Sequence, residues 1–176
     1  MKFPRHKFHE LKYHLFGQVL LCGLFMGLVL FIMGMFSSSS VAWAVGATSL
    51  ASSAYGVFVL PHSVVAEPKR ILLAYLIATI VGLLFHAILG YFSLSITDHA
   101  LTFDSHFFWI LSALAVAITM FFMMLFGAQH PPATGIALAM VSDVNNWKAF
   151  AGIWISILIL VAIRGLFSKY LRDLVE

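Results

Sequence analysis

The sequence predicts an all-α protein, a polytopic bundle of transmembrane helices, on three observations. Of the 176 residues, 62% are hydrophobic and only 10% are charged, whereas a soluble domain has about 45–50% apolar and about 25% charged residues. The mean hydropathy is +1.01, and the apolar residues form long runs whose edges carry the Lys and Arg residues. The basic residues therefore indicate membrane topology rather than a nucleic-acid partner, and the lipid bilayer is the first expected partner.

Four apolar runs have the length of a bilayer-spanning helix, which needs about 20 residues. They cover about 16–36, 71–92, 107–127 and 148–168. The first run is longer than the roughly 7–15 residues of a signal-peptide core, so we expect it to be retained as a span. The predicted organisation is an N-terminal arm over 1–15, a single transmembrane domain over 16–168 and a tail over 169–176.

Two further segments, 37–61 and 128–146, read as short or broken helices. The first opens with four serines and ends at Pro61, and the second contains Pro131-Pro132 followed by a short apolar stretch. If both cross the membrane, there are six segments, and each half of the chain has its irregular segment in the middle. That order is typical of a 3+3 inverted repeat.

The placement of the basic residues favours six crossings with both termini in the cytoplasm, because cytoplasmic loops collect Lys and Arg. With six crossings the cytoplasmic side holds Lys2, Arg5, Lys7, Lys12, Lys69, Arg70, Arg164, Lys169 and Arg172, and the other side holds only Lys148. We expect the protein to be integral to a membrane, with the bacterial plasma membrane as its predicted location.

His130-Pro131-Pro132-Ala133 marks the expected functional site. A proline pair ends one helix and suits the first turn of the next. A helix that starts deep in the membrane directs backbone N–H groups and its positive dipole end at a region that attracts an anion. Gln129, His130 and Thr134 would add side-chain hydrogen bonds. The alternative is that the prolines only end the preceding helix and His130 is an interfacial turn residue.

The segment 37–61 supplies the predicted other half of this site. Its hydroxyl groups belong to Thr48, Ser49, Ser52 and Ser53, and Gly46 would allow a close backbone approach. The alternative is helix packing, which small residues also promote. His86, inside an apolar run, would relay a proton or hold the anion, or it is a satisfied core histidine.

Several functions are excluded by missing residue types. No Asp, Glu or Lys lies inside a proposed span, which argues against a carrier with an acidic relay and against an intramembrane protease. We expect neither enzymatic activity nor a cofactor. Gly23 and Gly27 form a GxxxG pattern that predicts a helix contact, which leaves a homo-oligomer open.

The chain resembles the HPP family of small integral membrane proteins. The resemblance rests on His130-Pro131-Pro132, on the small-residue stretch from Ala133 to Leu138 and on the block from Gly46 to Arg70, and it extends over roughly 40–165. Members in plants and cyanobacteria are associated with nitrite transport, so the resemblance implies that activity here. The chain departs from the family pattern at Glu67, where Gln is usual, and at Thr134, where Gly is usual.

We therefore expect a transporter or channel for a small monovalent anion, nitrite first. The predicted anion-binding residues are Gly46, Thr48, Ser49, Ser52, Ser53, His86, Gln129, His130, Pro131, Pro132, Ala133 and Thr134. A second negative charge would find no buried fixed cation to balance it. The alternatives are a membrane anchor or sensor without transport, and a metal carrier that uses His62, His86 and His130.

Overall fold

The computed structural model describes residues 5–36, 40–96, 106–142 and 147–174, and in these ranges it contains helices and no strand. The α-helices are α1 (Arg5–Phe36), α2 (Ser40–Val59), α3 (Pro68–Ile96), α4 (His106–Leu125), α5 (Thr134–Ser142) and α6 (Trp147–Phe167). Two single-turn 3-10 helices, η1 (Val64–Ala66) and η2 (Pro131–Ala133), precede α3 and α5. The predicted all-α class is confirmed.

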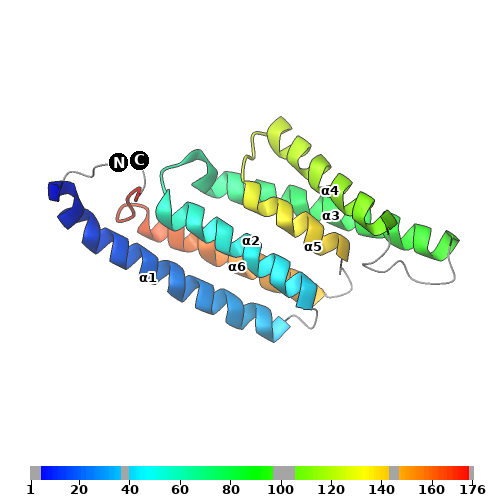
Figure 1. The fold of residues 1–176 in the computed structure, drawn as a ribbon, viewed down its shortest axis with the longest axis horizontal. Coiled ribbons are helices and arrows are strands. Elements are labelled where there is room, and N and C mark those ends of the chain that lie inside the picture. The colour runs from blue at the N-terminus through cyan, green and yellow to red at the C-terminus, as the bar shows by residue number, and fades with distance from the viewer. Residues whose placement is uncertain (1–4, 37–39, 97–105, 143–146, 175–176) are drawn as a thin grey trace.

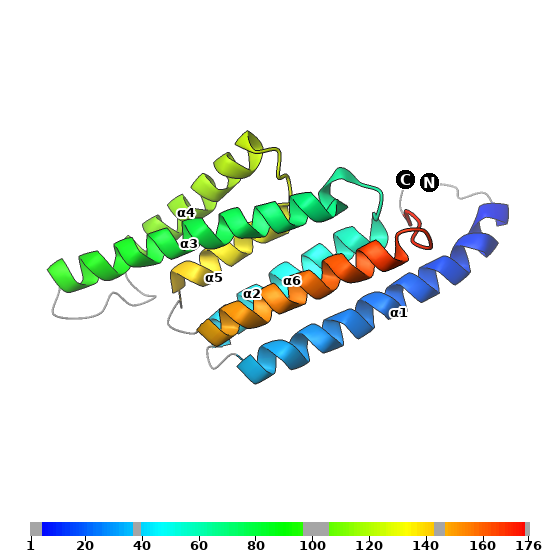
Figure 2. The same ribbon diagram turned by 180° about the vertical axis from the view of Figure 1, so that it is seen from behind.

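The helices lie side by side, and successive helices run in opposite directions (Figure 1). Helices α1, α2 and α6 contact one another, and so do α3, α4 and α5. The two groups meet where α2 packs against α5 and where α3 packs against α6, as both views show (Figure 2). The start of α1 and the end of α6 lie at the same end of the bundle (Figure 1).

Four helices are long and apolar enough to cross a membrane. These segments are Tyr13–Met35, Pro68–Phe92, His106–Leu125 and Phe150–Phe167, and they confirm the four predicted runs within a few residues. The short α5 is confirmed as well, since η2 and α5 together cover only Pro131–Ser142. Which side of the membrane holds the termini stays a prediction.

The segment that we expected to be broken, 37–61, instead contains the continuous helix α2, which is 20 residues long. Its hydroxyl groups explain the difference. The Thr48 hydroxyl donates to the Ala44 carbonyl at 2.7 Å, and the Ser53 hydroxyl reaches the Ser49 carbonyl at 3.0 Å. Since a hydroxyl within reach of the carbonyl four residues earlier can be accommodated inside a helix, these residues need not interrupt it.

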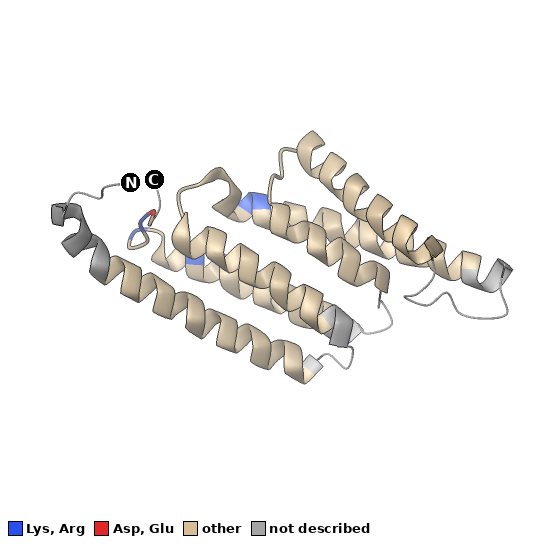
Figure 3. Cartoon of the chain, in the orientation of Figure 1, with Lys and Arg blue, Asp and Glu red and all other residues tan. Residues whose placement is uncertain are grey.

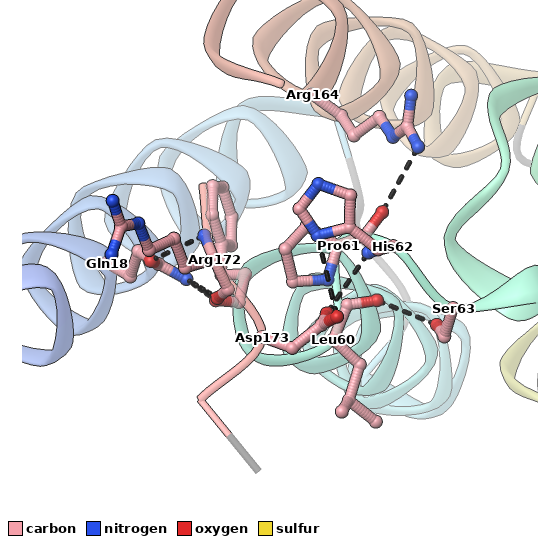
Figure 4. A network of polar contacts seen from close by, with 9 residues as sticks. Gln18, Leu60, Pro61, His62, Ser63, Arg164, Arg172 and Asp173 are labelled. Atoms are coloured by element: carbon pink, nitrogen blue, oxygen red, sulfur yellow. Dashed lines mark hydrogen bonds and ion pairs between the residues drawn. The ribbon is translucent and has the colours of Figure 1, made fainter. Parts of the chain in front are cut away.

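The described part of the C-terminal tail, through Leu174, packs at the end of the bundle where α6 ends (Figure 4). The Gln18 side chain on α1 accepts from the Arg172 backbone N–H at 3.0 Å and donates to the Arg172 carbonyl at 2.9 Å. The backbone N–H of Leu174 donates to the Val59 carbonyl at 2.9 Å. The tail thereby connects α1 with the end of α2.

The turn between α2 and α3 lies at this same end. Asp173 accepts a hydrogen bond from the His62 backbone N–H at 3.1 Å, and Arg164 on α6 donates to the Pro61 carbonyl at 3.1 Å. Arg70, in the first turn of α3, donates to the Gly127 carbonyl at 2.7 Å. Basic residues of α3, α6 and the tail therefore lie toward the side of the bundle where α3 begins and α6 ends (Figure 3), and that this side is cytoplasmic stays a prediction.

Candidate functional site

His130 is the central residue of the candidate site, and its side chain is fully enclosed, with 1% of its surface exposed. One ring nitrogen, Nδ1, lies 2.7 Å from the Val65 carbonyl in the turn before α3. The other, Nε2, lies 2.8 Å from the Ser53 hydroxyl on α2. The ring also packs against Tyr75 of α3, with ring centroids 5.8 Å apart. His130 therefore connects the start of η2 to three other elements.

The hydrogen-bond partners determine the tautomer of this histidine. A carbonyl oxygen only accepts, so the Nδ1 of His130 carries the hydrogen that points at Val65. In a neutral ring Nε2 then accepts from the Ser53 hydroxyl, which in turn lies 2.7 Å from the Tyr75 hydroxyl. Tyr75, Ser53 and His130 thus form a continuous chain of hydrogen bonds, which we call the buried polar chain.

Ser49 joins this buried polar chain to the proline pair. Its hydroxyl donates to the Pro132 carbonyl at 2.9 Å, and its own carbonyl lies 3.0 Å from the Ser53 hydroxyl and 3.4 Å from the Tyr75 hydroxyl. The structure therefore brings together the two segments that the sequence predicted as halves of one site. That they bind an anion stays a prediction.

Beside Ser49 an open groove of about 460 Å³ lies between α2 and the start of α5. It is lined by Ala44, Val45, Thr48, Ser49, Ser52, Pro131, Pro132, Thr134 and Gly135. Six of these nine residues belong to the predicted site. Thr48 and Ser52 are exposed, so the groove opens on the outer surface of the bundle. Ser49 is the residue shared by the groove and the hydrogen-bonded interior.

The predicted depth of the site, near the membrane midplane, stays a prediction. Ser49 lies at the middle of α2, and Ser53 lies about 5 Å from that midpoint and about 9 Å from the last residue of the helix, at about 1.5 Å per residue. His130 bonds to Ser53 and to the turn before α3. The candidate site therefore extends from the middle of α2 toward the α2–α3 turn.

The expected anion contact at the helix start is also contradicted. The first two residues of η2, Pro131 and Pro132, are prolines, which have no backbone N–H group. The next two donors are engaged, because the Ala133 N–H bonds to the His130 carbonyl at 3.1 Å and the Thr134 N–H bonds to the carbonyls of the two prolines. The proline pair thus removes the free donors that usually make a helix start attract anions.

Three predicted site residues lie elsewhere. Gly46 is on another face of α2, where a Cβ would meet Met33 of α1 at 3.1 Å and Ile153 of α6 at 3.2 Å, so it serves close helix packing. Gln129 is exposed in the turn before His130. His86 bonds through Nδ1 to the Val141 carbonyl at 3.0 Å, at the far end of α5.

These positions also bear on the metal-carrier alternative. His62 pairs with Asp173, His86 with a carbonyl of α5 and His130 with Ser53 and Val65. Among the residues that the structure describes, no three His, Cys, Asp or Glu side chains are close enough to hold a metal ion. A Cβ added at either GxxxG glycine, Gly23 or Gly27, would meet nothing within 4 Å, so the described part of the chain makes no close helix contact there.

Tyr75 and the Val65 carbonyl were missed by the sequence reasoning. Tyr75 did leave a signal, because it lies inside an apolar run, and a buried tyrosine hydroxyl usually finds a hydrogen-bond partner. The Val65 carbonyl left none, since a backbone acceptor in a turn has no side-chain signature. Only the folded chain places it against His130.

Comparison with known proteins agrees with this architecture. The family described as the HPP transmembrane region matches residues 10–173, nearly the whole chain. A protein of Dictyostelium discoideum, described as a transmembrane protein, is 29% identical over 111 residues, which are 62% of this chain and 35% of the relative. The chain thus spans about a third of that relative's length. No solved structure matches.

Proposed function

The chain belongs to the HPP transmembrane family, and from that membership we propose that it is a transporter or channel that passes a small monovalent anion, with nitrite as the first candidate. Its predicted setting is the bacterial plasma membrane, with both termini cytoplasmic. We propose no catalytic activity for it. The groove beside Ser49 and the buried polar chain are the proposed anion site.

The observation that carries the proposal is the buried polar chain. An ionisable residue buried in a membrane protein, such as a histidine, is a candidate for a substrate or ion pathway, whereas buried hydroxyls also join neighbouring helices. Here Ser53, Tyr75 and His130 are each 0–1% exposed. They lie directly behind a groove whose Thr48, Ser52 and Thr134 supply further hydroxyls. The proposal therefore rests on the buried histidine and the hydroxyl-lined groove lying together.

The charges near the site favour a small anion with a single charge. Arg70 bonds to Glu67 at 2.7 Å, which leaves this pair with no net charge at the start of α3. The contacts of His130 that the structure describes are with neutral groups. Hydroxyl groups can solvate one negative charge, whereas a second would need a fixed cation close by. The choice of nitrite among such anions rests on the family resemblance alone.

The helix contacts are compatible with the inverted repeat that we propose for the two halves. When α1 is exchanged with α4, α2 with α5 and α3 with α6, each α-helix pair in contact becomes a pair that is also in contact, and α2 with α5 and α3 with α6 map onto themselves. The contact of α1 with α2 becomes that of α4 with α5, and the contact of α3 with α5 becomes that of α6 with α2. Paired halves of this kind are common in transporters.

Uptake of nitrite into proteoliposomes tests the proposal. The purified chain should raise nitrite uptake above that of protein-free liposomes, which must be measured in parallel because the neutral acid crosses lipid unaided. Substituting Thr48→Val in the groove should lower uptake, whereas Thr119→Val, buried on α4, should change it little. A folded protein that gives no uptake above the lipid background would favour the anchor or sensor alternative.

A further inference from the structure

The buried polar chain can hold its hydrogens in two different arrangements. Three hydrogens matter: one on the Tyr75 hydroxyl, one on the Ser53 hydroxyl and one on the Nε2 of His130 when the ring is charged. The acceptors within reach are the two hydroxyl oxygens, the Ser49 carbonyl and the uncharged Nε2. Each arrangement must satisfy every buried donor, because an unpaired one is costly.

With a neutral His130, the hydrogens point from Tyr75 toward the histidine. The Tyr75 hydroxyl donates to Ser53, and the Ser53 hydroxyl donates to Nε2. Nδ1 donates to the Val65 carbonyl. Every hydrogen is used, and the Ser49 carbonyl receives no hydroxyl hydrogen.

With a charged His130, the direction reverses. Nε2 now donates to the Ser53 oxygen, and the Ser53 hydroxyl turns to the Ser49 carbonyl, which lies 3.0 Å away. The Tyr75 hydroxyl keeps an acceptor in either the Ser53 oxygen or the Ser49 carbonyl. No heavy atom has to move, since only the hydroxyl hydrogen of Ser53 rotates. The same geometry therefore accommodates one additional proton.

The groups around His130 leave this proton without a compensating negative charge. From α2 the ring contacts Ser53, from η1 the Val65 carbonyl, and from α3 Tyr75. At the start of α3, Glu67 and Arg70 pair with each other, and Lys69 is exposed, so none of these residues supplies an unpaired negative charge. A buried imidazolium therefore lacks a counter-charge until an anion arrives in the neighbouring groove, and a buried anion lacks one until the imidazolium forms.

We propose that His130 takes up one proton for each anion bound, so that the protein moves a proton and an anion together. This inference rests on the proposed anion transport. The proton passes from water to Nε2 of His130 and leaves the same atom when the anion departs, and the net charge moved is zero. Ser53 is the hydroxyl that turns, and Tyr75 is a positioning residue that acts through Ser53.

The first test uses the unaltered protein in liposomes that contain a pH-sensitive dye. Nitrite uptake and internal acidification are recorded together, with protein-free liposomes subtracted. We expect about one proton per nitrite and a rate that does not change when a membrane potential is imposed. Nitrite uptake without acidification, or uptake driven by the potential, would overturn proton coupling and leave anion transport standing. No uptake at all would overturn both.

The second test asks whether His130 is the group that carries the proton. The uptake rate of the unaltered protein should fall about tenfold for each pH unit once the pH exceeds the pKa of the coupling group, because the charged fraction falls in that proportion. His130→Gln should lose this dependence. His106→Gln, an exposed histidine at the start of α4, should keep it. A pH dependence unchanged in folded His130→Gln would assign the proton to another residue.

The third test separates positioning from packing. Tyr75→Phe removes the hydroxyl that polarises Ser53 as a donor to neutral His130 and that competes for the Ser53 oxygen in the charged state. The charged state is therefore favoured, and the midpoint of the pH profile should move to higher pH. Tyr91→Phe, an exposed position on the same helix, should not move it. Reduced uptake with an unmoved midpoint in Tyr75→Phe would leave Tyr75 with a packing role only.

Discussion

Replacing Gly82 by alanine should push α3 and α5 apart. An added Cβ would lie 2.5 Å from the Met140 Cβ and 2.8 Å from the Ala137 carbonyl oxygen, whereas ordinary contacts of carbon atoms are about 3.5–4.0 Å. The helices must therefore separate by about 1 Å. Overpacking of this kind costs about 1–3 kcal/mol, and the upper value applies because neither contacting atom can rotate away. Alanine regains about 1 kcal/mol of helix propensity, so we expect a net destabilisation of about 2 kcal/mol.

The free energy of unfolding is measured on purified protein in mixed detergent micelles. The fraction of dodecyl sulfate is increased stepwise, and tryptophan fluorescence monitors the unfolding. Gly90→Ala is the matched control, because Gly90 lies on the same helix and its Cβ position has nothing within 4 Å. The control should gain about 0.5–1 kcal/mol. If Gly82→Ala proved as stable as Gly90→Ala, the close packing of α3 on α5 would be refuted.

Three further outcomes are expected. Ser49→Ala removes the hydrogen bond to the Pro132 carbonyl and should cost about 1 kcal/mol in the same unfolding assay; an unchanged midpoint would contradict that bond. Gln18→Leu breaks both bonds to the Arg172 backbone, so limited proteolysis should cut the tail faster, and an unchanged rate would show that the tail is held by other contacts. Nitrite at a hundred times its dissociation constant should stabilise the folded chain by about 2.7 kcal/mol, measured as a rise in melting temperature; chloride raising it equally would remove nitrite as the preferred anion.

The sequence alone predicted the parts of the structure that depend on local composition. The four long spans follow from apolar run length, since a bilayer needs about 20 residues per helix. The shortness of α5 follows from Pro131-Pro132 and from the polar residues after Ser142. The prediction that segments 37–61 and 128–146 lie together is confirmed by the contact of α2 with α5, although the interruption expected in the first segment is absent. Hydroxyl residues in α2 misled the prediction, since they bond within the helix as readily as they interrupt it.

The sequence by itself thus determined that this chain is a membrane-embedded helical bundle with a special position at His130, since burial of apolar surface and proline geometry act within a few turns of the chain. Only the tertiary structure decided what His130 contacts. Its partners, Ser53, Val65 and Tyr75, come from three other elements. The helix start at the proline pair was expected to offer free backbone N–H groups, but its first positions offer none. Hydrogen bonds between distant segments depend on helix packing, which no local pattern encodes.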